Sequence, residues 1–369
     1  MRSGGQRATL APDAAGSRFT HWVVARCEPS TNQPTEVSVR VLVTGGAGYI
    51  GSVVVAQLAA NGHDVTVIDN LSKGHRAAVD ARARLDVVDL GDREAVTRVV
   101  SLAKPEATIH FAAQSLVGES MAKPLPYYRG NVAATLNLLE ALEGTGCTAF
   151  VLSSTAAVYG SPTDGPLDPI DESHRLLPTN TYGDTKLACE RMVAWASRAS
   201  GMRAVALRYF NAAGATADLG EDHDPESHLI PNVIRVALGL APSIGQFGDD
   251  YPTADGTTVR DYVHVSDLAR AHVLAVDALF RDEIGHDALN LGTGTGHSVA
   301  EVIASVARVS GRDVPVVRQG RRDGDPPALV ASGDLARSVL GWAPEHVAID
   351  DITESAWTWA CRFPDGYPD

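Results

Sequence analysis

The glycine-rich turn at residues 44–51, TGGAGYIG, is the feature that most constrains the fold of this chain. It follows the apolar run VRVLV and precedes residues 49–61, which are rich in Ala, Val, Gln and Leu and indicate a helix. Its glycines have the spacing G-x-x-G-x-x-G and are Gly45, Gly48 and Gly51. Such a turn brings the backbone and the positive end of a helix close to a pyrophosphate. The spacing is weak evidence alone, but its place between a strand and a helix predicts a dinucleotide-binding unit.

Strands and helices alternate along the chain up to about residue 210. After the first strand and helix, short apolar runs predict strands at residues 64–69, 84–90, 107–113, 148–154 and 203–210. Helical patterns lie between them, at residues 92–103, 124–145 and 182–200. This alternation predicts an α/β fold, in which helices cover both faces of a doubly wound parallel (Rossmann) sheet.

The pattern changes on either side of this region. Residues 212 to about 260 are rich in Gly, Asp and Pro and are expected to be mostly loops, with shorter helices and strands after them. We therefore expect an NAD-binding domain at 39–211 and a smaller, mostly C-terminal α+β substrate-binding domain at 212–369, with some segments returning to the first domain. Residues 1–38 mix Arg, Pro, Ser and Thr without a pattern, and we expect a disordered extension or a wrongly extended start.

Charge and cysteine content exclude several classes of partner. The formal net charge of −14 disfavours binding to nucleic acid or to an anionic membrane surface, since both need a basic face. No apolar run is long enough to span a bilayer. The four cysteines lack metal-ligand spacing, so the sequence predicts no metal site and reduced thiols in the cytoplasm.

Asp69 ends the second predicted strand, where a carboxylate binds the adenosine ribose in dinucleotide folds. A carboxylate accepts hydrogen bonds from the ribose hydroxyls and repels a 2′-phosphate, so NAD is preferred to NADP. The alternative is an Asp that merely opens the following turn. Lys73 and Arg76 lie nearby and favour that alternative.

Tyr182 and Lys186 stand four residues apart in NTYGDTK, on one face of a predicted helix. The chain has lysine only at positions 73, 104, 123 and 186, so a lysine here is unusual. A phenol titrates near 10, and nearby positive charge favours phenolate, which can accept a proton from an alcohol. We expect Tyr182 to be the catalytic base, with Lys186 supplying charge and reaching the cofactor ribose.

A hydroxyl group is expected beside Tyr182, at the end of a strand, where open α/β sheets bind ligands. The stretch SSTAAVYG offers three at the end of the fifth predicted strand, namely Ser153, Ser154 and Thr155. The residue pattern alone does not decide among them.

Four motifs together resemble the extended short-chain dehydrogenase/reductase family: TGGAGYIG, SSTAAVYG, YGDTK and RYFNAAGA. Longer stretches resemble its UDP-glucose 4-epimerase branch, which acts in galactose metabolism: FAAQSLVGES, GQFGDDYPTADGTTVRDYVHVSDLA, NLGTGTGHSV and FPDGYPD. The resemblance covers residues 39–369. The glycine turn and Y-x-x-x-K occur throughout the superfamily, whereas YPTADGT…VRDYVHV is far more specific to the epimerases.

The resemblance implies an isomerase with tightly bound NAD, a UDP-sugar substrate and a homodimer formed through the helices at 92–103 and 124–145. It implies the catalytic residues Thr155, Tyr182 and Lys186. The implied cofactor residues are Gly45, Gly48, Tyr49, Ile50, Gly51, Asp69, Asn70, Leu71, Ser72, Lys73, Gly74, Asp89, Leu90, Phe111, Ala112, Ala113, Ser115, Asn131, Tyr182, Lys186 and Phe210. The implied substrate residues are Thr155, Tyr182, Asn211, His228, Leu229, Gln246, Phe247, Arg260, Arg322, Asp325 and Leu329.

Three positions depart from the pattern of many relatives, which have Ser at 155, Lys at 115 or Tyr at 329, where this chain has Thr155, Ser115 and Leu329. The smaller Leu329 leads us to expect that UDP-GalNAc and UDP-GlcNAc are also accepted.

The main alternatives are other enzymes of the same scaffold, a UDP-pentose 4-epimerase or a nucleotide-sugar dehydratase or decarboxylase. The dehydratases follow the strand-end threonine with Asp-Glu, whereas Ala156 and Ala157 stand here. A non-enzymatic NAD-binding regulator is disfavoured because the Tyr–Lys pair is kept.

Overall fold

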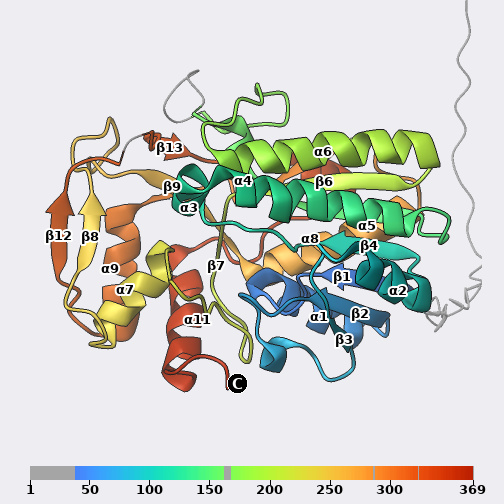
Figure 1. Cartoon of the computed structure of the whole chain (residues 1–369). Coiled ribbons are helices and arrows are strands. Elements are labelled where there is room, and N and C mark those ends of the chain that lie inside the picture. The colour runs from blue at the N-terminus through green and yellow to red at the C-terminus, as the bar shows by residue number, and fades with distance from the viewer. Residues whose placement is uncertain (1–37, 162–167, 286, 323, 369) are drawn as a thin grey trace, which may run out of the picture. The chain divides into compact units, whose positions relative to one another are not determined.

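A seven-stranded parallel sheet is the centre of the computed structural model, which describes residues 38–161, 168–285, 287–322 and 324–368 (Figure 1). The strand order is β10-β6-β5-β4-β1-β2-β3, and every neighbouring pair is parallel. The strands are β1 Arg40–Thr44, β2 Asp64–Asp69, β3 Arg84–Val87, β4 Ala107–His110, β5 Ala149–Thr155, β6 Arg203–Tyr209 and β10 Ala288–Leu291. The predicted doubly wound sheet is confirmed, with β10 as a seventh strand that the sequence pattern did not reveal.

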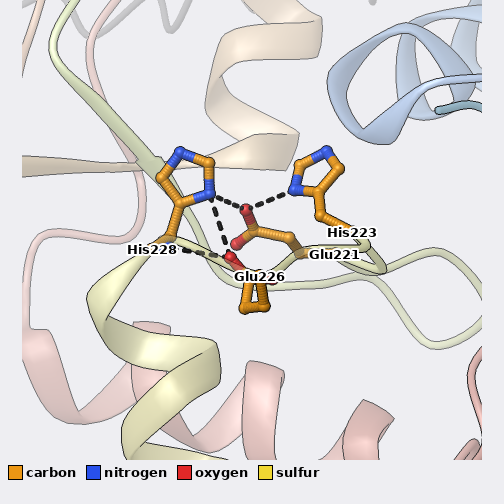
Figure 2. Close-up of side chains that lie close together, drawn as sticks. All are labelled: Glu221, His223, Glu226 and His228. Carbon is orange, nitrogen blue, oxygen red and sulfur yellow. Dashed lines mark hydrogen bonds and ion pairs between the residues drawn. The ribbon is translucent and has the colours of Figure 1, made fainter. Parts of the chain in front are cut away.

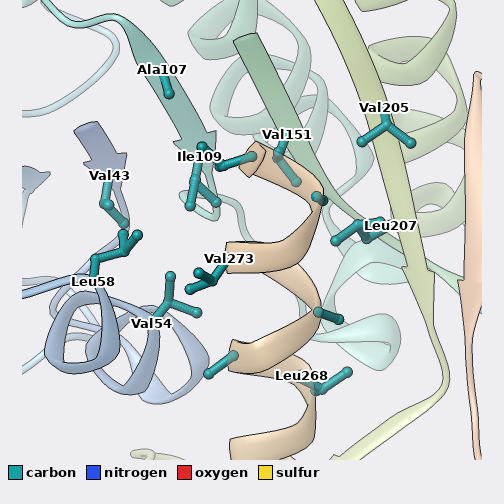
Figure 3. Close-up of a cluster of buried hydrophobic side chains, with 14 of the residues drawn as sticks. Val43, Val54, Leu58, Ala107, Ile109, Val151, Val205, Leu207, Leu268 and Val273 are labelled. Carbon is teal, nitrogen blue, oxygen red and sulfur yellow. The ribbon is translucent and has the colours of Figure 1, made fainter. Parts of the chain in front are cut away.

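Helices cover both faces of this sheet. On one face lie α1 Tyr49–Ala60, α8 Val265–Phe280 and α10 Asp334–Leu340, and on the other α2 Arg93–Ala103, α5 Ala134–Leu142 and α6 Thr181–Ser200. Figure 3 shows Leu58 of α1 beside Val43 of β1, and Val273 of α8 beside Val54 of α1, on the first face. The strand neighbour Leu42 belongs to the core of the second face. Because alternate strand residues face opposite sides, strands that are buried on both sides are continuously apolar in sequence.

The helix predicted at 124–145 is interrupted. The chain forms α3 Val117–Ala122, α4 Pro124–Tyr127, a π-type turn at Tyr128–Ala133 and then α5, which ends at Leu142. A widened turn of this kind often marks a functional position in a helix. Here it holds the buried Asn131, whose contacts are described below.

The remaining residues form a smaller group of elements. Strands β7 Asn211–Ala213, β9 Val259–His264, β11 Gly296–Ser298 and β13 Ala328–Leu329 make one sheet, and β8 Ile244–Phe247 pairs with β12 Val316–Gln319. Helices α7 Leu229–Ala237, α9 Val299–Ser310 and α11 Ile349–Arg362 share a core that includes Val233, Val302 and Ile352. Short 3-10 turns occur at Arg76–Ala78 and Ala156–Tyr159.

The expectation that residues 212 to about 260 are mostly loops is confirmed, with α7 and β8 as the main regular elements inside this stretch. The Gly-, Asp- and Pro-rich composition ends before Leu229, and the apolar face of LIPNVIRVA packs into a core. The described residues belong to one compact unit, Val37–Asp369, and the division at residue 211 stays a prediction. The expectation for residues 1–37 lies outside the described residues. No helix in the described ranges is long and apolar enough to cross a bilayer.

The order of the strands places a ligand site beside β1. The chain continues from β1 to β2 on one side and reaches β4 on the other, so the connections leave the sheet in opposite directions at this point. In open α/β sheets, ligands bind at such a switch point, outside the carboxyl ends of the strands. The glycine turn after β1 and residues 111–115 after β4 both lie at this edge.

Candidate active site

The glycine turn brings helix α1 close to the sheet. Gly45 has φ +72°, and a Cβ atom on it would lie 2.6 Å from the backbone nitrogen of Ala112. A Cβ atom on Gly51 would lie 2.2 Å from the carbonyl oxygen of Gly45. No side chain caps the N-terminus of α1, and its first turn has no acidic residue. The turn therefore leaves a positive helix end open to an anion.

Asp69 connects this turn to the end of β2. Its Oδ2 accepts from the backbone N–H of Ala47 (3.0 Å) and its Oδ1 from that of Leu71 (2.8 Å). Burial raises the pKa of the carboxyl group, and these two hydrogen bonds oppose that rise. The hydrogen bond from Leu71 shows that Asp69 does open the following turn, which was the alternative considered above. Each carboxylate oxygen can still accept a further hydrogen bond, so this contact leaves room for a ribose hydroxyl. Lys73, which could favour a 2′-phosphate, donates to the carbonyl of Asp224.

Helix α6 begins just before the Tyr–Lys pair. The side chain of Asn180 caps the helix by accepting from Gly183 N–H at 2.8 Å, and Ser120 Oγ accepts from Tyr182 N–H at 3.1 Å. A Cβ atom on Gly183 would lie 2.5 Å from the carbonyl oxygen of Ala157, so the glycine of YGDTK lets α6 approach the turn after β5. These contacts determine where Tyr182 lies relative to Thr155.

Thr155 is the strand-end hydroxyl that contacts the tyrosine. Its hydroxyl lies close enough to Tyr182 to lower the pKa of the phenol, and it accepts from Ala157 N–H at 3.1 Å. Ser153 instead bonds to the Tyr209 hydroxyl, and Ser154 donates to Glu190 at 2.5 Å. The structure therefore decides the choice that the residue pattern left open.

Burial has the largest effect on the pKa values of both Tyr182 and Lys186. Burial raises the pKa of Tyr182 to about 12, although the hydrogen bond with Thr155 opposes this rise. Burial also lowers the pKa of Lys186, which is 2% exposed. Lys186 is not among the groups that shift the pKa of Tyr182, so the lowering expected from its charge is not found, and desolvation dominates. A tyrosine that accepts a proton near neutral pH needs further positive charge beside its ring.

Asn131 joins the segment after β4 to helix α6. Its Oδ1 accepts from Gln114 N–H at 2.8 Å, and its Nδ2 donates to Gln114 O at 3.1 Å and to Thr185 Oγ1 at 2.9 Å. Its side chain is therefore occupied in positioning the segment between β4 and α3, next to the predicted cofactor residues. Leu90, predicted beside the adenine, packs its side chain into the core formed by α2 and α5.

Strand β9 brings together several predicted substrate residues. Tyr262 of β9 pairs with Asn211, and Arg260, two residues earlier, pairs with Leu329 of β13. Leu329 and Phe210 both pack against the apolar cluster that contains Ala156 and Val158. The register thus connects the sugar-side residues to the turn that follows Thr155.

The charged substrate residues have partners within the chain. Arg260 forms an ion pair with Asp325 and donates to Val259 O at 2.7 Å. Arg322 lies over the Phe247 ring, 3.9 Å from its centre, next to the buried Gln246 of β8. Arg322 and Arg260, the two cations predicted to bind the diphosphate, therefore lie at β8 and β9.

His228 lies in a cluster with Glu221, His223 and Glu226 (Figure 2). Its Nδ1 is 2.5 Å from Glu221 Oε1 and 3.3 Å from Glu226 Oε1. Burial disfavours charge on His228, but attraction to Glu221 and hydrogen bonds to both carboxylates raise its pKa to about 10. Leu229 follows as the first residue of α7.

The donor set fits a dinucleotide on observations of this structure. A Cβ atom would collide with backbone at Gly45 and Gly51, the end of α1 is uncapped, and the buried Asp69 can accept from hydroxyls. Lys186 as a whole is 2% exposed, and its ammonium donates to no other group of the described residues. A buried ammonium needs partners, and ribose hydroxyls would supply them.

Comparisons with known proteins agree with this geometry. The model of the NAD dependent epimerase/dehydratase family matches residues 41–292. The chain belongs to this family. It is 47% identical over 333 residues to a UDP-glucose 4-epimerase of Lacticaseibacillus casei, covering 89% of this chain and 99% of that protein. It is 49% identical over 325 residues to a UDP-glucose 4-epimerase of Rhizobium meliloti, covering 87% of this chain and 97% of that protein.

Solved structures of family members match the whole described fold. A crystal structure of a UDP-glucose 4-epimerase has a TM-score of 0.85 and 46% identity, covering 89% of this chain and 99% of that one. The enzyme from Brucella ovis, solved in complex with NAD, has a TM-score of 0.82 and 46% identity, covering 86% and 97%.

Several residues that position helix α6 were not predicted from the sequence. Asn180, Ser120 and Gly183 orient the start of α6, and Glu190 anchors its middle. Asn180 could have been found, since an Asn directly before a helical pattern is a capping signal. The roles of Ser120 and Glu190 depend on contacts distant in sequence, so no local signal reveals them.

Proposed function

We propose that this chain interconverts UDP-galactose and UDP-glucose with NAD as a tightly bound cofactor. The observation that carries the proposal is that Tyr182 and Lys186 lie one turn apart at the start of α6, with the Thr155 hydroxyl beside Tyr182, at the carboxyl edge of the sheet. The relatives named above, nearly half identical over almost their whole length, support the same reaction.

The residues proposed to hold NAD surround the switch point of the sheet. Gly45, Gly48, Gly51 and the start of α1 would face the pyrophosphate, and Asp69 would accept from the adenosine ribose. Lys186 would donate to the nicotinamide ribose. When bound, NAD supplies reversible hydride transfer at C4′ of the sugar.

Tyr182 would remove the proton from the 4′-hydroxyl and later return it. Burial keeps its phenol neutral, so positive charge at the ring is needed to favour phenolate. The Thr155 hydroxyl holds the Tyr182 oxygen in place and shortens the path of the proton. The 4-keto sugar then turns about its link to the diphosphate, so that its other face meets Tyr182 and the cofactor.

Arg260 and Arg322 are proposed to bind the diphosphate, with the ring of His228 beside the substrate. Their guanidinium groups can form two parallel hydrogen bonds to phosphate oxygens. They also supply the local positive charge that a diphosphate site needs in a chain of net charge −14. The Arg260–Asp325 pair would rearrange on binding, because the guanidinium has to share its donors between carboxylate and phosphate.

The pocket for the sugar is proposed to accept N-acetylated substrates as well. Leu329 lies opposite Arg260 and packs on the cluster that follows Thr155, so its size limits the space next to the sugar. A Leu329→Tyr variant should lose turnover of UDP-GalNAc while keeping that of UDP-galactose. Equal turnover of both substrates by the variant would remove Leu329 from the argument.

The other reactions of this scaffold have less support. A dehydratase needs an acid–base pair after the strand-end threonine, and Ala156 and Ala157 carry no titratable group. A UDP-pentose 4-epimerase differs only in how its pocket treats C6. Assaying UDP-xylose beside UDP-galactose separates that alternative.

The proposed function is tested with a Tyr182→Phe variant and with Tyr128→Phe as the matched control. Tyr128 is exposed and bonds to Asp184 on the outside of α6. Purified protein, without added NAD, is incubated with UDP-galactose, and UDP-glucose is measured. Loss of a proton-transfer group typically costs about 10²–10⁴-fold in rate. Near-normal turnover by Tyr182→Phe, with bound NAD unchanged, would refute the assignment of the base.

We also propose a cytoplasmic homodimer. Exposed apolar side chains lie on three adjacent helices: Leu102 on α2, Leu136 on α5 and Trp195 on α6. Because α5 packs against both α2 and α6, a contact centred on α5 would cover this surface. Leu136→Asp should shift the mass measured by light scattering from two chains to one. The free thiols of Cys147, Cys189 and Cys361 fit a reducing compartment.

A further inference from the structure

Four potential metal ligands converge in the segment before α7. Glu221, His223, Glu226 and His228 each offer one ligand atom, and these atoms all lie within 4.8 Å of one another. Both histidines turn Nδ1 toward the carboxylates, and Figure 2 shows the second nitrogen of each ring facing away from them. These residues have the spacing E-x-H-x-x-E-x-H, which contains no cysteine. The expectation of no metal site was drawn from the spacing of the cysteines alone.

The distances are close to those of a tetrahedral site. Zn²⁺ with bonds of about 2.0 Å separates neighbouring ligand atoms by about 3.3 Å. Here Nδ1 of His223 is 3.1 Å from Glu221 Oε1, and Nδ1 of His228 is 3.3 Å from Glu226 Oε1. The separation of 2.5 Å between His228 and Glu221 would open by less than an ångström when an ion replaces the proton between them.

The charges near the cluster favour a cation. The side chains of Glu221 and Glu226 are 7% and 6% exposed, and among the described residues no lysine or arginine pairs with either. By contrast, Asp218 in the same segment has a cation from elsewhere, Arg362. The two nearly buried carboxylates therefore depend on the two imidazoles and on any bound cation to offset their charge.

The cluster lies beside a cavity. A cavity of about 100 Å³ lies between the segment around residues 214–240 and helix α11, and its lining includes Glu221, His223 and Glu226. Ligands with this nitrogen and carboxylate composition suit Zn²⁺ and similar divalent ions.

We propose that Glu221, His223, Glu226 and His228 bind one divalent transition-metal cation of the Zn²⁺ class. Both histidines ligate as neutral rings through Nδ1, and any Nδ1 proton leaves to water. The Nε2 of His228 stays free to face the substrate. The ion holds a segment that also contacts the cofactor side, because Asp222 accepts from His75 and the His223 ring packs on the Tyr49 ring.

The test uses untagged full-length protein, treated with a chelator and dialysed. Titration with Zn²⁺ in a calorimeter should give one site per chain, and Co²⁺ should give the absorption bands of a four-coordinate site. His223→Asn and Glu226→Gln should each weaken Zn²⁺ binding by about 10–100-fold or more, since even partners outside the ligand shell have effects of that size. Zn²⁺ should raise the melting temperature of the parent protein and not that of His223→Asn.

His346→Asn is the matched control, because His346 packs on His264 at 4.2 Å in another close pair of imidazoles. It should bind Zn²⁺ as the parent does. The proposal is overturned if the parent protein binds no Zn²⁺ below millimolar concentration, if His223→Asn and Glu226→Gln bind as tightly as the parent, or if His346→Asn abolishes binding. Circular dichroism shows that each variant is folded. None of these outcomes depends on epimerase turnover.

Discussion

Replacing Glu190 by Ala should destabilise the protein severely, because it breaks the buried ion pair under the catalytic helix. Arg208 Nε lies 3.0 Å from Glu190 Oε1 and its terminal nitrogen lies 2.6 Å from Oε2, a bidentate pair. The side chains are 7% and 9% exposed. Ser154 Oγ donates to the same carboxylate, and Tyr159 accepts from the arginine. Glu190 is one helical turn beyond Lys186.

The expected cost follows from burial. Glu190→Ala leaves a buried guanidinium without its carboxylate, which costs about 3–5 kcal/mol. The Ser154 hydroxyl also loses its acceptor, which adds about 1 kcal/mol. Many proteins are stable by only about 5–15 kcal/mol, so the variant should unfold at much lower urea concentration.

A double variant distinguishes the effect of losing one partner of the ion pair from the effect of leaving a cavity. Glu190→Leu with Arg208→Met removes both charges and keeps the volume, so it should be within about 1–2 kcal/mol of the parent. Urea unfolding followed by circular dichroism measures all three proteins. The reasoning is refuted if Glu190→Ala costs less than about 1 kcal/mol, or if the double variant is as unstable as the single one.

Three further outcomes are expected. Thr155→Val should lower turnover by about 10–100-fold while Thr155→Ser stays near the parent, since only valine removes the hydroxyl that bonds to Tyr182. Gly51→Ala should release NAD and lower thermal stability, because its Cβ would lie 2.2 Å from a carbonyl oxygen. Burial, with repulsion from Lys186, lowers the pKa of His110 to about 3. As the pH falls below the ordinary value near 6.5, the unfolded chain binds a proton that the folded chain excludes, so stability falls between pH 6.5 and 3. At pH 5 this loss is about 2 kcal/mol, and His110→Asn should flatten the pH dependence by that amount.

Each of these predictions has a control. Kinetics of Thr155→Ser are measured beside Thr155→Val, and equal rates would show that the hydroxyl is not used. Gly118→Ala is the control for Gly51, since no atom lies within 4 Å of a Cβ there. His63→Asn, at a partly exposed position, should leave the pH dependence of unfolding unchanged. An unchanged profile for His110→Asn would contradict the argument from burial.

Short-range patterns were sufficient to predict the NAD-binding half of the fold. Six strands and the helices around them appear in the sequence as apolar runs of the right period, and their ends agree within a few residues. The glycine turn and the Tyr182–Lys186 spacing are local as well, because a turn and a helical face are properties of consecutive residues. The seventh strand β10 was missed because its four residues resemble many short apolar runs.

The sequence by itself determined which chemical groups this protein can use: a glycine turn before a helix, a carboxylate at Asp69 and a Tyr–Lys pair on one face of a helix. Only the tertiary structure decided that Thr155, and not Ser153 or Ser154, meets Tyr182. It also decided that burial raises the pKa of Tyr182, and that two glutamates and two histidines converge before α7. The reason is that hydrogen-bond choice, desolvation and clustering depend on distances between segments that are far apart in the chain, which no local pattern of residues encodes.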